Sequence, residues 1–202
     1  TTESFATPTR MKDYHPEAVI SGTRIAHDNK AIVVNLARAG TFPSHICYDF
    51  LHNFLPPENV RQDHIFASRA TDNSMNVIGT DLSAAKIGGD VVNSTVFFPD
   101  PMGATGNTIV SALEHYKKNL KGPARRYIAL HLIVTPEYLK KVNTAHPDLE
   151  IYTFRVDRGL SSPDVLNSPY GKYWDQEKGL NEKGYIVPGG GGFGEIMNNS
   201  FV

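Results

Sequence analysis

The sequence is poor in three features: cysteine, long apolar runs and net charge. Its one cysteine, Cys47, excludes an internal disulfide and every zinc pattern built on several cysteines. No apolar run approaches the about 20 residues that span a bilayer. The 20 Lys and Arg nearly balance the 21 Asp and Glu, so the net charge of −1 gives no basic surface for nucleic acid. We therefore expect a cytoplasmic protein that has neither a membrane nor a nucleic acid as partner.

The chain does contain a regular alternation of strand and helix signals over its 202 residues. Apolar runs predict strands, and apolar residues spaced by three or four predict helices. The expected strands are residues 31–36, 60–67, 94–98, 127–134, 149–156 and a short one at 185–187. The expected helices are residues 43–54, 109–120 and 135–145. Because strands alternate with helices, we predict one α/β domain with a parallel sheet.

Three segments interrupt this alternation. Residues 1–30, broken by two prolines and a glycine, are expected to form an irregular arm. Residues 70–94 are rich in Gly, Ser, Asn and Asp, which favours a long excursion or hairpin. Residues 158–184 are polar and rich in turn-forming residues. These segments are therefore expected outside the sheet's core.

Residues 97–108 carry the strongest chemical signal. They place Asp100 and the turn Thr-Gly-Asn-Thr between a buried strand and a helix. The amides of a helix's first turn favour a bound phosphate. The hydroxyls of Thr105 and Thr108 and the amide of Asn107 add donors. A plain connection with a capping Thr is the alternative, and the segment is no Walker loop because no Lys follows the glycine.

The same segment resembles the phosphoribosyl-pyrophosphate loop of the uracil phosphoribosyltransferase family, in the form Asp-Pro-Met-x-Ala-Thr-Gly. Four further segments resemble that family's motifs in its order, at residues 36–40, 68–69, 146–153 and 179–189. The resemblance implies a type I phosphoribosyltransferase-like α/β fold, with a central parallel sheet flanked by helices. It also implies a single domain over residues 1–202, in which residues 157–202 form a C-terminal hood and base-binding loop.

The resemblance further implies a reaction in which uracil and phosphoribosyl pyrophosphate (PRPP) give uridine monophosphate (UMP) and pyrophosphate. Arg38 and Arg69 would hold the pyrophosphate, and Asp100 the ribose hydroxyls. The residues implied for the 5′-phosphate are Ala104, Thr105, Gly106, Asn107 and Thr108. The residues implied for uracil are Met102, Ala104, Tyr185, Ile186, Gly191, Gly192 and Phe193. Mg²⁺ would bind mainly through PRPP, with no metal site of the protein's own, and the chain would form a homodimer or higher homo-oligomer.

This sequence departs from the family pattern at three places. The region before Arg38 is shorter, and an insertion lies between Arg158 and Lys178. In the base loop, the family's Pro-Gly-x-Gly-Asp-x-Gly-Asp-Arg becomes Pro-Gly-Gly-Gly-Gly-Phe-Gly-Glu-Ile at residues 188–196, so that Gly192 replaces a carboxylate. Two alternatives therefore stay open: a catalytically degenerate, regulatory nucleotide- or base-binding protein, and a phosphoribosyltransferase for another base.

Overall fold

The computed structural model describes residues 1–71, 77–190 and 193–198. Its main sheet has the strand order β5–β4–β3–β6–β8–β7, with β9 paired to β8. The strands are β3 (Lys30–Ala37), β4 (Val60–Thr71), β5 (Val77–Lys86), β6 (Ser94–Pro99), β7 (Met102–Gly103), β8 (Arg126–Val134) and β9 (Leu149–Val156). Within the described residues, β4 and β5 are antiparallel and the other pairs are parallel. The predicted sheet is confirmed, with an antiparallel edge added.

Helices cover both faces of this sheet. They are α1 (Thr41–Leu51), α2 (Asn107–Asn119), α3 (Pro136–Ala145), α4 (Pro163–Leu166) and α5 (Phe193–Asn198), with 3₁₀ turns η1 (Pro57–Asn59) and η2 (Trp174–Gln176). Because side chains alternate along a strand, Ile32 and Val34 of β3 pack with Leu113 of α2. Ala31 packs instead with Leu51 of α1. Of the described helices, none is long and apolar enough to cross a bilayer.

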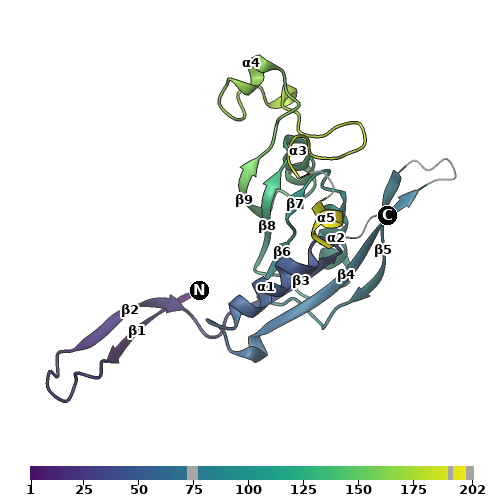
Figure 1. Ribbon diagram of the computed structural model, residues 1–202. Helices are drawn as coiled ribbons and strands as arrows, with labels where there is room; N and C mark the ends of the chain where they lie inside the picture. The colour runs from purple at the N-terminus through teal and green to yellow at the C-terminus, as the bar shows by residue number, and fades with distance from the viewer. Residues whose placement is uncertain (72–76, 191–192, 199–202) are drawn as a thin grey trace.

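The carboxyl ends of the parallel strands lie at one edge of the sheet, where ligands bind in open α/β folds. In Figure 1 the ends of β8 and β9 point towards the segment that contains α4. Arg38 follows β3, Asp100 follows β6, and Asp157 follows β9. The first two of these ends approach each other closely at Gly40. A Cβ on Gly40 would lie only 3.1 Å from the carbonyl oxygen of Pro99, so the absence of a side chain permits this approach.

The N-terminal arm is an antiparallel hairpin of β1 (Thr2–Pro8) and β2 (Val19–Ile25), and it extends away from the sheet (Figure 1). The expectation of an irregular arm was wrong. Pro8 is the last residue of β1 and Pro16 lies in the connection, so neither proline interrupts a strand. Gly22 lies opposite Phe5, and a Cβ there would be 3.3 Å from the Phe5 ring. The hairpin therefore accommodates both prolines and the glycine.

Helix α1 begins and ends earlier than predicted, and its apolar stripe faces away from the sheet. Ile46 and Phe50 are 52% and 61% exposed, and Phe54 lies beyond the helix at 42%. The predicted hairpin within residues 70–94 is confirmed by β4 and β5. The expected strand at 185–187 is reduced to one bridge between Leu180 and Ile186.

Residues 158–178 form a compact segment, here called the insertion lobe. Its ends meet in a bridge between Gly159 and Lys178, and it contains α4 and η2. Arg158 and Glu177, both nearly fully buried, form an ion pair at 2.8 Å. Trp174 attaches the lobe to α3, because the Lys140 ammonium lies 5.4 Å from its ring centroid. The lobe is therefore ordered around its own polar interior.

Candidate functional site

The loop between β6 and α2 turns sharply into the helix. Gly106, the residue before α2, has a left-handed φ of 79°, which glycine adopts without strain. Gly106 has no side chain that accepts from the first-turn amides, and the first turn of α2 contains no acidic residue. The Asn107 amide donates to the Thr105 hydroxyl through a long contact of 3.5 Å. With no acid and no cap from Gly106, the positive end of this thirteen-residue helix still favours an anion. This end includes Asn107 and Thr108, two of the predicted phosphate-binding residues.

Helix α3 and its capping residue hold the loop from behind. The Thr135 hydroxyl donates to the carbonyl of Ala104 at 2.7 Å and accepts from the Tyr138 amide at 3.0 Å. Gly103 lies so close that a Cβ would be 2.8 Å from Val134 and 3.0 Å from the Tyr138 ring. Since real Cβ contacts are longer than this, glycine is required there for the loop to lie on α3.

A buried histidine fixes the backbone of Asp100. His131 Nδ1 lies 2.5 Å from the Asp100 carbonyl oxygen, and its Nε2 lies 2.6 Å from the Tyr138 hydroxyl. Because a carbonyl can only accept, Nδ1 carries the hydrogen and Nε2 accepts from Tyr138. Burial lowers the pKa of His131 to about 4, although the bond to Asp100 opposes this, so the ring is neutral near pH 7. The chain Tyr138–His131–Asp100 therefore positions the start of the loop.

The Asp100 carboxyl itself titrates near neutrality. Burial raises its pKa to about 7, and the hydrogen bond with the Met102 backbone opposes that rise. Asp100 directly follows the carboxyl end of β6, and the residue as a whole is half-buried. A carboxylate in this position can accept hydrogen bonds from sugar hydroxyls above about pH 7.

The two predicted pyrophosphate residues lie on neighbouring parallel strands. Arg38 directly follows β3 and is half-buried, and its carbonyl accepts from the Thr41 amide at 3.1 Å. Arg69 lies in β4, where its backbone is opposite Thr80 of β5, and its side chain is outside the described residues. The fold thus brings the two backbones to adjacent strand ends.

The C-terminal segment reaches the loop at two places. A Cβ on Gly184 would lie 3.4 Å from Thr105 Cγ2, so the chain before Tyr185 packs beside the loop between β6 and α2. Tyr185 is 37% exposed, whereas Ile186 is buried. Farther along, a Cβ on Gly190 would overlap the end of the Met102 side chain. The segment therefore lies on the loop through glycines.

A cavity of about 280 Å³ lies beside this second contact. Its walls include the predicted base residues Met102 and Phe193, whereas Ala104, Tyr185 and Ile186 do not line it. Gly191 and Gly192 are outside the described residues. The lining residues are Met102, Leu132, Ile133, Arg155, Asp157, Pro188, Gly189, Gly190 and Phe193.

Asp157 is a polar residue of this cavity that the sequence analysis missed. One carboxylate oxygen accepts from the Gly159 amide at 2.9 Å, and the other, Oδ2, is buried with no hydrogen bond in the described structure. A Cβ on Gly189 would lie 2.6 Å from Oδ2, and one on Gly179 would lie 2.1 Å from the Asp157 carbonyl oxygen. Its position directly after a strand, like that of Asp100, was an available signal.

His131 was missed for a different reason. It is the one histidine in the apolar run of β8, and the sequence does not show which distant groups would bond it. As to metal sites, the described residues contain no group of three or more His, Cys, Asp or Glu side chains that could hold an ion.

Comparison with known proteins gives this geometry a family. The family model described as uracil phosphoribosyltransferase matches residues 2–176. The chain belongs to this family. The match includes Arg38, Arg69 and the loop 100–108, whereas the predicted base residues 185–193 lie beyond it.

Among relatives, the uracil phosphoribosyltransferase of Thermosipho melanesiensis is 33% identical over 171 residues, 85% of this chain and 66% of that protein. The uracil phosphoribosyltransferase of Methanococcus vannielii is 29% identical, over 85% of this chain and 61% of that protein. That of Thermococcus kodakarensis is 29% identical over 68% of this chain and 49% of its own length. The matches thus span about half to two thirds of these relatives.

A solved structure from Aquifex aeolicus has a TM-score of 0.63 to this chain at 20% identity. The match covers 96% of this chain and 74% of that one, which shows a shared fold. The family membership and this likeness together confirm the predicted type I phosphoribosyltransferase-like fold.

Proposed function

We propose that this chain transfers the phosphoribosyl group of PRPP to uracil, which yields UMP and pyrophosphate. The observation that carries the proposal is the open start of α2, where a left-handed Gly106 follows Asp100 in a loop of the family's form. Membership of the uracil phosphoribosyltransferase family supports the transferase class. The loop supplies amides for a phosphate and a carboxylate for a ribose.

The proposed roles follow from where charge develops in the reaction. Positive charge builds on the ribose as pyrophosphate leaves, so catalysis is mainly positioning and electrostatic stabilisation. Arg38 and Arg69 hold the departing pyrophosphate, because guanidinium forks bind phosphate oxygens strongly. Asp100 binds the ribose hydroxyls, and the amides and hydroxyls of residues 104–108 hold the 5′-phosphate. Holding the 5′-phosphate and the ribose fixes the position of the ribose carbon, from which pyrophosphate departs as the bond to uracil forms.

The base would lie between Met102 and Ala104 of the loop and the segment 185–193. We propose that backbone N–H and C=O groups of this segment read the pyrimidine edge, since its glycines let main chain approach a flat ring. Ile186, Gly191, Gly192 and Phe193 are the residues proposed for this contact, with Tyr185 at the opening.

Mg²⁺ fits this arrangement as part of the substrate. Magnesium binds oxygen ligands and usually takes one or two carboxylates together with substrate phosphates. Asp100 is the carboxylate of the proposed phosphate loop and would be the protein ligand nearest to the substrate's phosphates. We therefore propose that the ion arrives bound to PRPP and neutralises the charge of the leaving pyrophosphate.

The test is a turnover assay with PRPP, Mg²⁺ and a panel of nucleobases, combined with calorimetric titration of UMP. Turnover with uracil, and with no other base of the panel, would support the proposal. Turnover with another base and none with uracil would contradict the base identity. Arg38→Ala should weaken PRPP binding while UMP affinity changes by less than about 1 kcal/mol, because UMP lacks the pyrophosphate.

A second candidate is a degenerate member that binds uracil or UMP but turns over slowly. It is favoured by Gly192, which stands where the family has a carboxylate. Loss of one transition-state contact of this kind costs about 10²–10³-fold in rate. Gly192→Asp should then raise the rate of UMP formation. A native rate that the Asp variant fails to increase, in a protein that stays folded, would reject this candidate.

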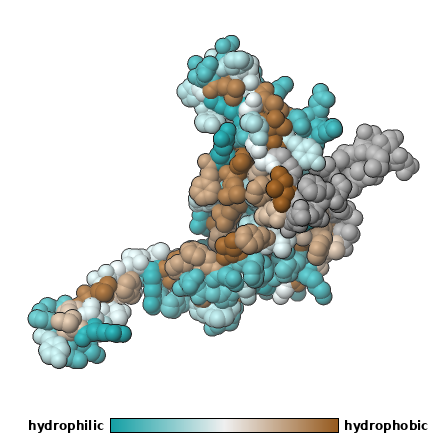
Figure 2. Space-filling view, viewed as in Figure 1, coloured by the Kyte–Doolittle hydropathy of each residue, from teal (hydrophilic) through white to brown (hydrophobic). Residues whose placement is uncertain are grey.

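We also propose a homodimer or higher homo-oligomer. Phe42, Ile46 and Phe50 on α1 are more than half exposed, and Figure 2 shows apolar residues gathered over α1 and the neighbouring sheet. Exposed apolar faces of this kind are typical of protein interfaces. Sedimentation of the native protein and of Phe50→Glu tests this, since the added charge should shift an oligomer towards monomer. A native monomer would overturn it.

A further inference from the structure

A positively charged side chain lies beside the open start of α2. The Lys141 ammonium donates to the side-chain oxygen of Asn107, the first residue of that helix. Lysine has donors and no acceptor, so the amide oxygen of Asn107 must face it. The NH₂ group of Asn107 is then directed away from Lys141, with two donors available to another group. The contact thus orders Asn107 and places a charge next to the helix end.

Lys141 belongs to the face of α3 that supports the loop. Three residues before it, Tyr138 packs on Gly103, and one residue after it, Val142 lies 3.1 Å from the position of a Cβ on Gly106. These contacts fix the distance between α3 and the loop. The reach of the Lys141 side chain towards α2 is therefore set by packing, although the side chain itself is exposed.

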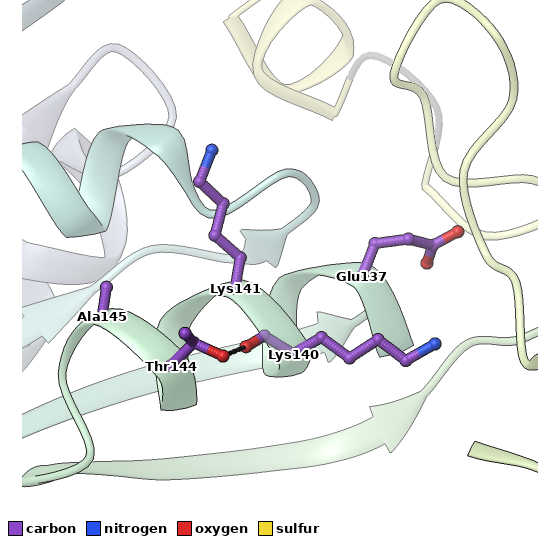
Figure 3. A pocket seen from close by; sticks show the side chains of 5 residues that line it. All are labelled: Glu137, Lys140, Lys141, Thr144 and Ala145. Atoms are coloured by element: carbon purple, nitrogen blue, oxygen red, sulfur yellow. Dashed lines mark hydrogen bonds between the residues drawn. The ribbon is translucent and has the colours of Figure 1, made fainter. Parts of the chain in front are cut away.

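The neighbouring lysine is directed elsewhere. Figure 3 shows Lys140 and Lys141 leaving α3 in different directions, along a hollow of about 560 Å³. Lys140 lies over the Trp174 ring of the insertion lobe. Two adjacent lysines thus have separate partners, and one of them faces the phosphate loop.

The charge of Lys141 is not neutralised by its natural helical neighbour. Glu137 precedes it by four residues, a spacing at which Glu and Lys commonly pair. The Glu137 carboxylate instead accepts from the amides of Gly179 at 3.1 Å and Leu180 at 3.2 Å. Within residues 1–71, 77–190 and 193–198, no carboxylate pairs with Lys141. The ammonium is therefore available to an anionic ligand.

We infer that Lys141 is a further phosphate-binding residue, which bonds the 5′-phosphate of a ribosyl phosphate at the start of α2. The inference rests on the proposed function for the location of that phosphate. A bound phosphate monoester carries nearly two negative charges near neutral pH. The amides of α2 supply partial positive charge, and Lys141 supplies a full one. Asn107 keeps the lysine in place and adds its own NH₂ donors.

The experiment compares Lys141→Gln with Lys140→Gln, which removes a charge one residue away that faces the lobe. Ribose 5-phosphate, UMP and uridine are titrated calorimetrically into the native protein and each variant. Lys141→Gln should weaken the binding of ribose 5-phosphate and of UMP about fivefold, the size expected for an exposed ion pair. The affinity for uridine should stay unchanged. Lys141→Arg should restore affinity to within about twofold, and high salt should shrink the loss.

Equal phosphate affinities in the native protein and Lys141→Gln would overturn the inference, as would an equal loss in Lys140→Gln. The ribose 5-phosphate titration separates this from the proposed function. If the native protein binds ribose 5-phosphate but not UMP, the proposed base is wrong, while the lysine is still judged by its variant. If the native protein binds neither phosphate, both proposals are overturned.

Discussion

The starts of α2 and α3 lie side by side and are built in opposite ways. At α3, Thr135 caps the Tyr138 amide, Pro136 occupies the first position, and Glu137 places a carboxylate in the first turn. At α2, Gly106 offers no cap and the first turn has no acid. Both helices follow strands at the same sheet edge, so the difference is local. The protein closes one positive helix end with its own groups, and the other is the end at which we propose that a phosphate binds.

The closed end also serves the open one. Thr135 caps α3 with its hydroxyl oxygen and uses the hydroxyl hydrogen to hold the Ala104 carbonyl. A complete cap on one helix thereby positions the loop that leads into the uncapped one. We therefore expect this side chain to couple the stability of α3 to phosphate binding at α2, and variants at the two ends can separate the two effects.

The largest effect is expected from opening the closed end with Thr135→Val. This removes the cap, about 1 kcal/mol, and leaves the Ala104 carbonyl without its donor, which together cost about 3 kcal/mol. Urea unfolding measures the loss. The control is Thr144→Val near the exposed end of the same helix, where the hydroxyl bonds the Lys140 carbonyl, and it should change stability by less than about 0.5 kcal/mol. Equal losses would show that the site of the cap is unimportant.

The Tyr138–His131–Asp100 chain between the two ends predicts a balanced pH dependence. The folded pKa of His131 lies below its unfolded value of 6.5, so His131 lowers stability as pH falls from 6.5 to about 4. The folded pKa of Asp100 lies above its unfolded value of 3.8, so Asp100 lowers stability as pH rises towards 7. Over pH 4.5–6.5 the two oppose each other, and the native free energy of unfolding should change by less than about 1 kcal/mol.

His131→Asn removes one side of this balance. In this variant Asp100 acts alone, so the free energy of unfolding should fall by about 2 kcal/mol as the pH rises from 4.5 to 6.5. Asp100→Asn should give the reverse slope, and denaturant titrations at three pH values measure both. Identical slopes in the two variants would contradict the assignment of opposite pKa shifts.

Filling the open end with Gly106→Ala should weaken ribose 5-phosphate binding about tenfold, because the loop must shift from Val142. A left-handed alanine also costs about 1–2 kcal/mol of stability. Gly171→Ala is the matched control, since Gly171 has a φ of 80° with nothing within 4 Å of a Cβ. It should lose similar stability and keep phosphate affinity. Loss of binding in both variants would indicate a general effect of strain.

The smallest effect concerns the carboxyl that borders the open end. With its pKa raised to about 7 by burial, Asp100 is mostly protonated at pH 6 and ionised at pH 8. Affinity for UMP should rise by at most about tenfold over this range, since one group changes charge. Ionisation of the UMP phosphate also contributes to this rise. Asp100→Asn should remove the contribution of the carboxyl and leave that of the phosphate. An unchanged profile would exclude Asp100 from ribose binding.

What the sequence predicted well is local. Residues 149–156 form β9 as expected, and Thr-Pro-Glu at residues 135–137 starts α3 as expected, because the relevant signals lie within one turn or strand. The Asp100 loop was likewise found from contiguous residues. The stripe on α1 was found, but periodicity marks an apolar face without showing what it packs against.

What the sequence could not show depends on long-range packing. His131 meets Asp100 across 31 residues, and Lys141 meets Asn107 across 34. Neither spacing follows from a local rule, because the sheet order brings these segments together. The N-terminal hairpin was missed because its breakers fall where a hairpin tolerates them.

Because its two ends meet, the insertion lobe is a compact excursion from the rest of the chain. Gly159 and Lys178 are bridged, so the lobe leaves and rejoins the framework at a single point. Inside it, Arg158 bonds Glu177 and the Ser168 carbonyl and lies 4.2 Å from the centroid of the Tyr170 ring. Insertions whose ends are this close change length at small entropic cost. A change of length between residues 159 and 178 can therefore leave the spacing between β9 and residues 179–190 unaltered.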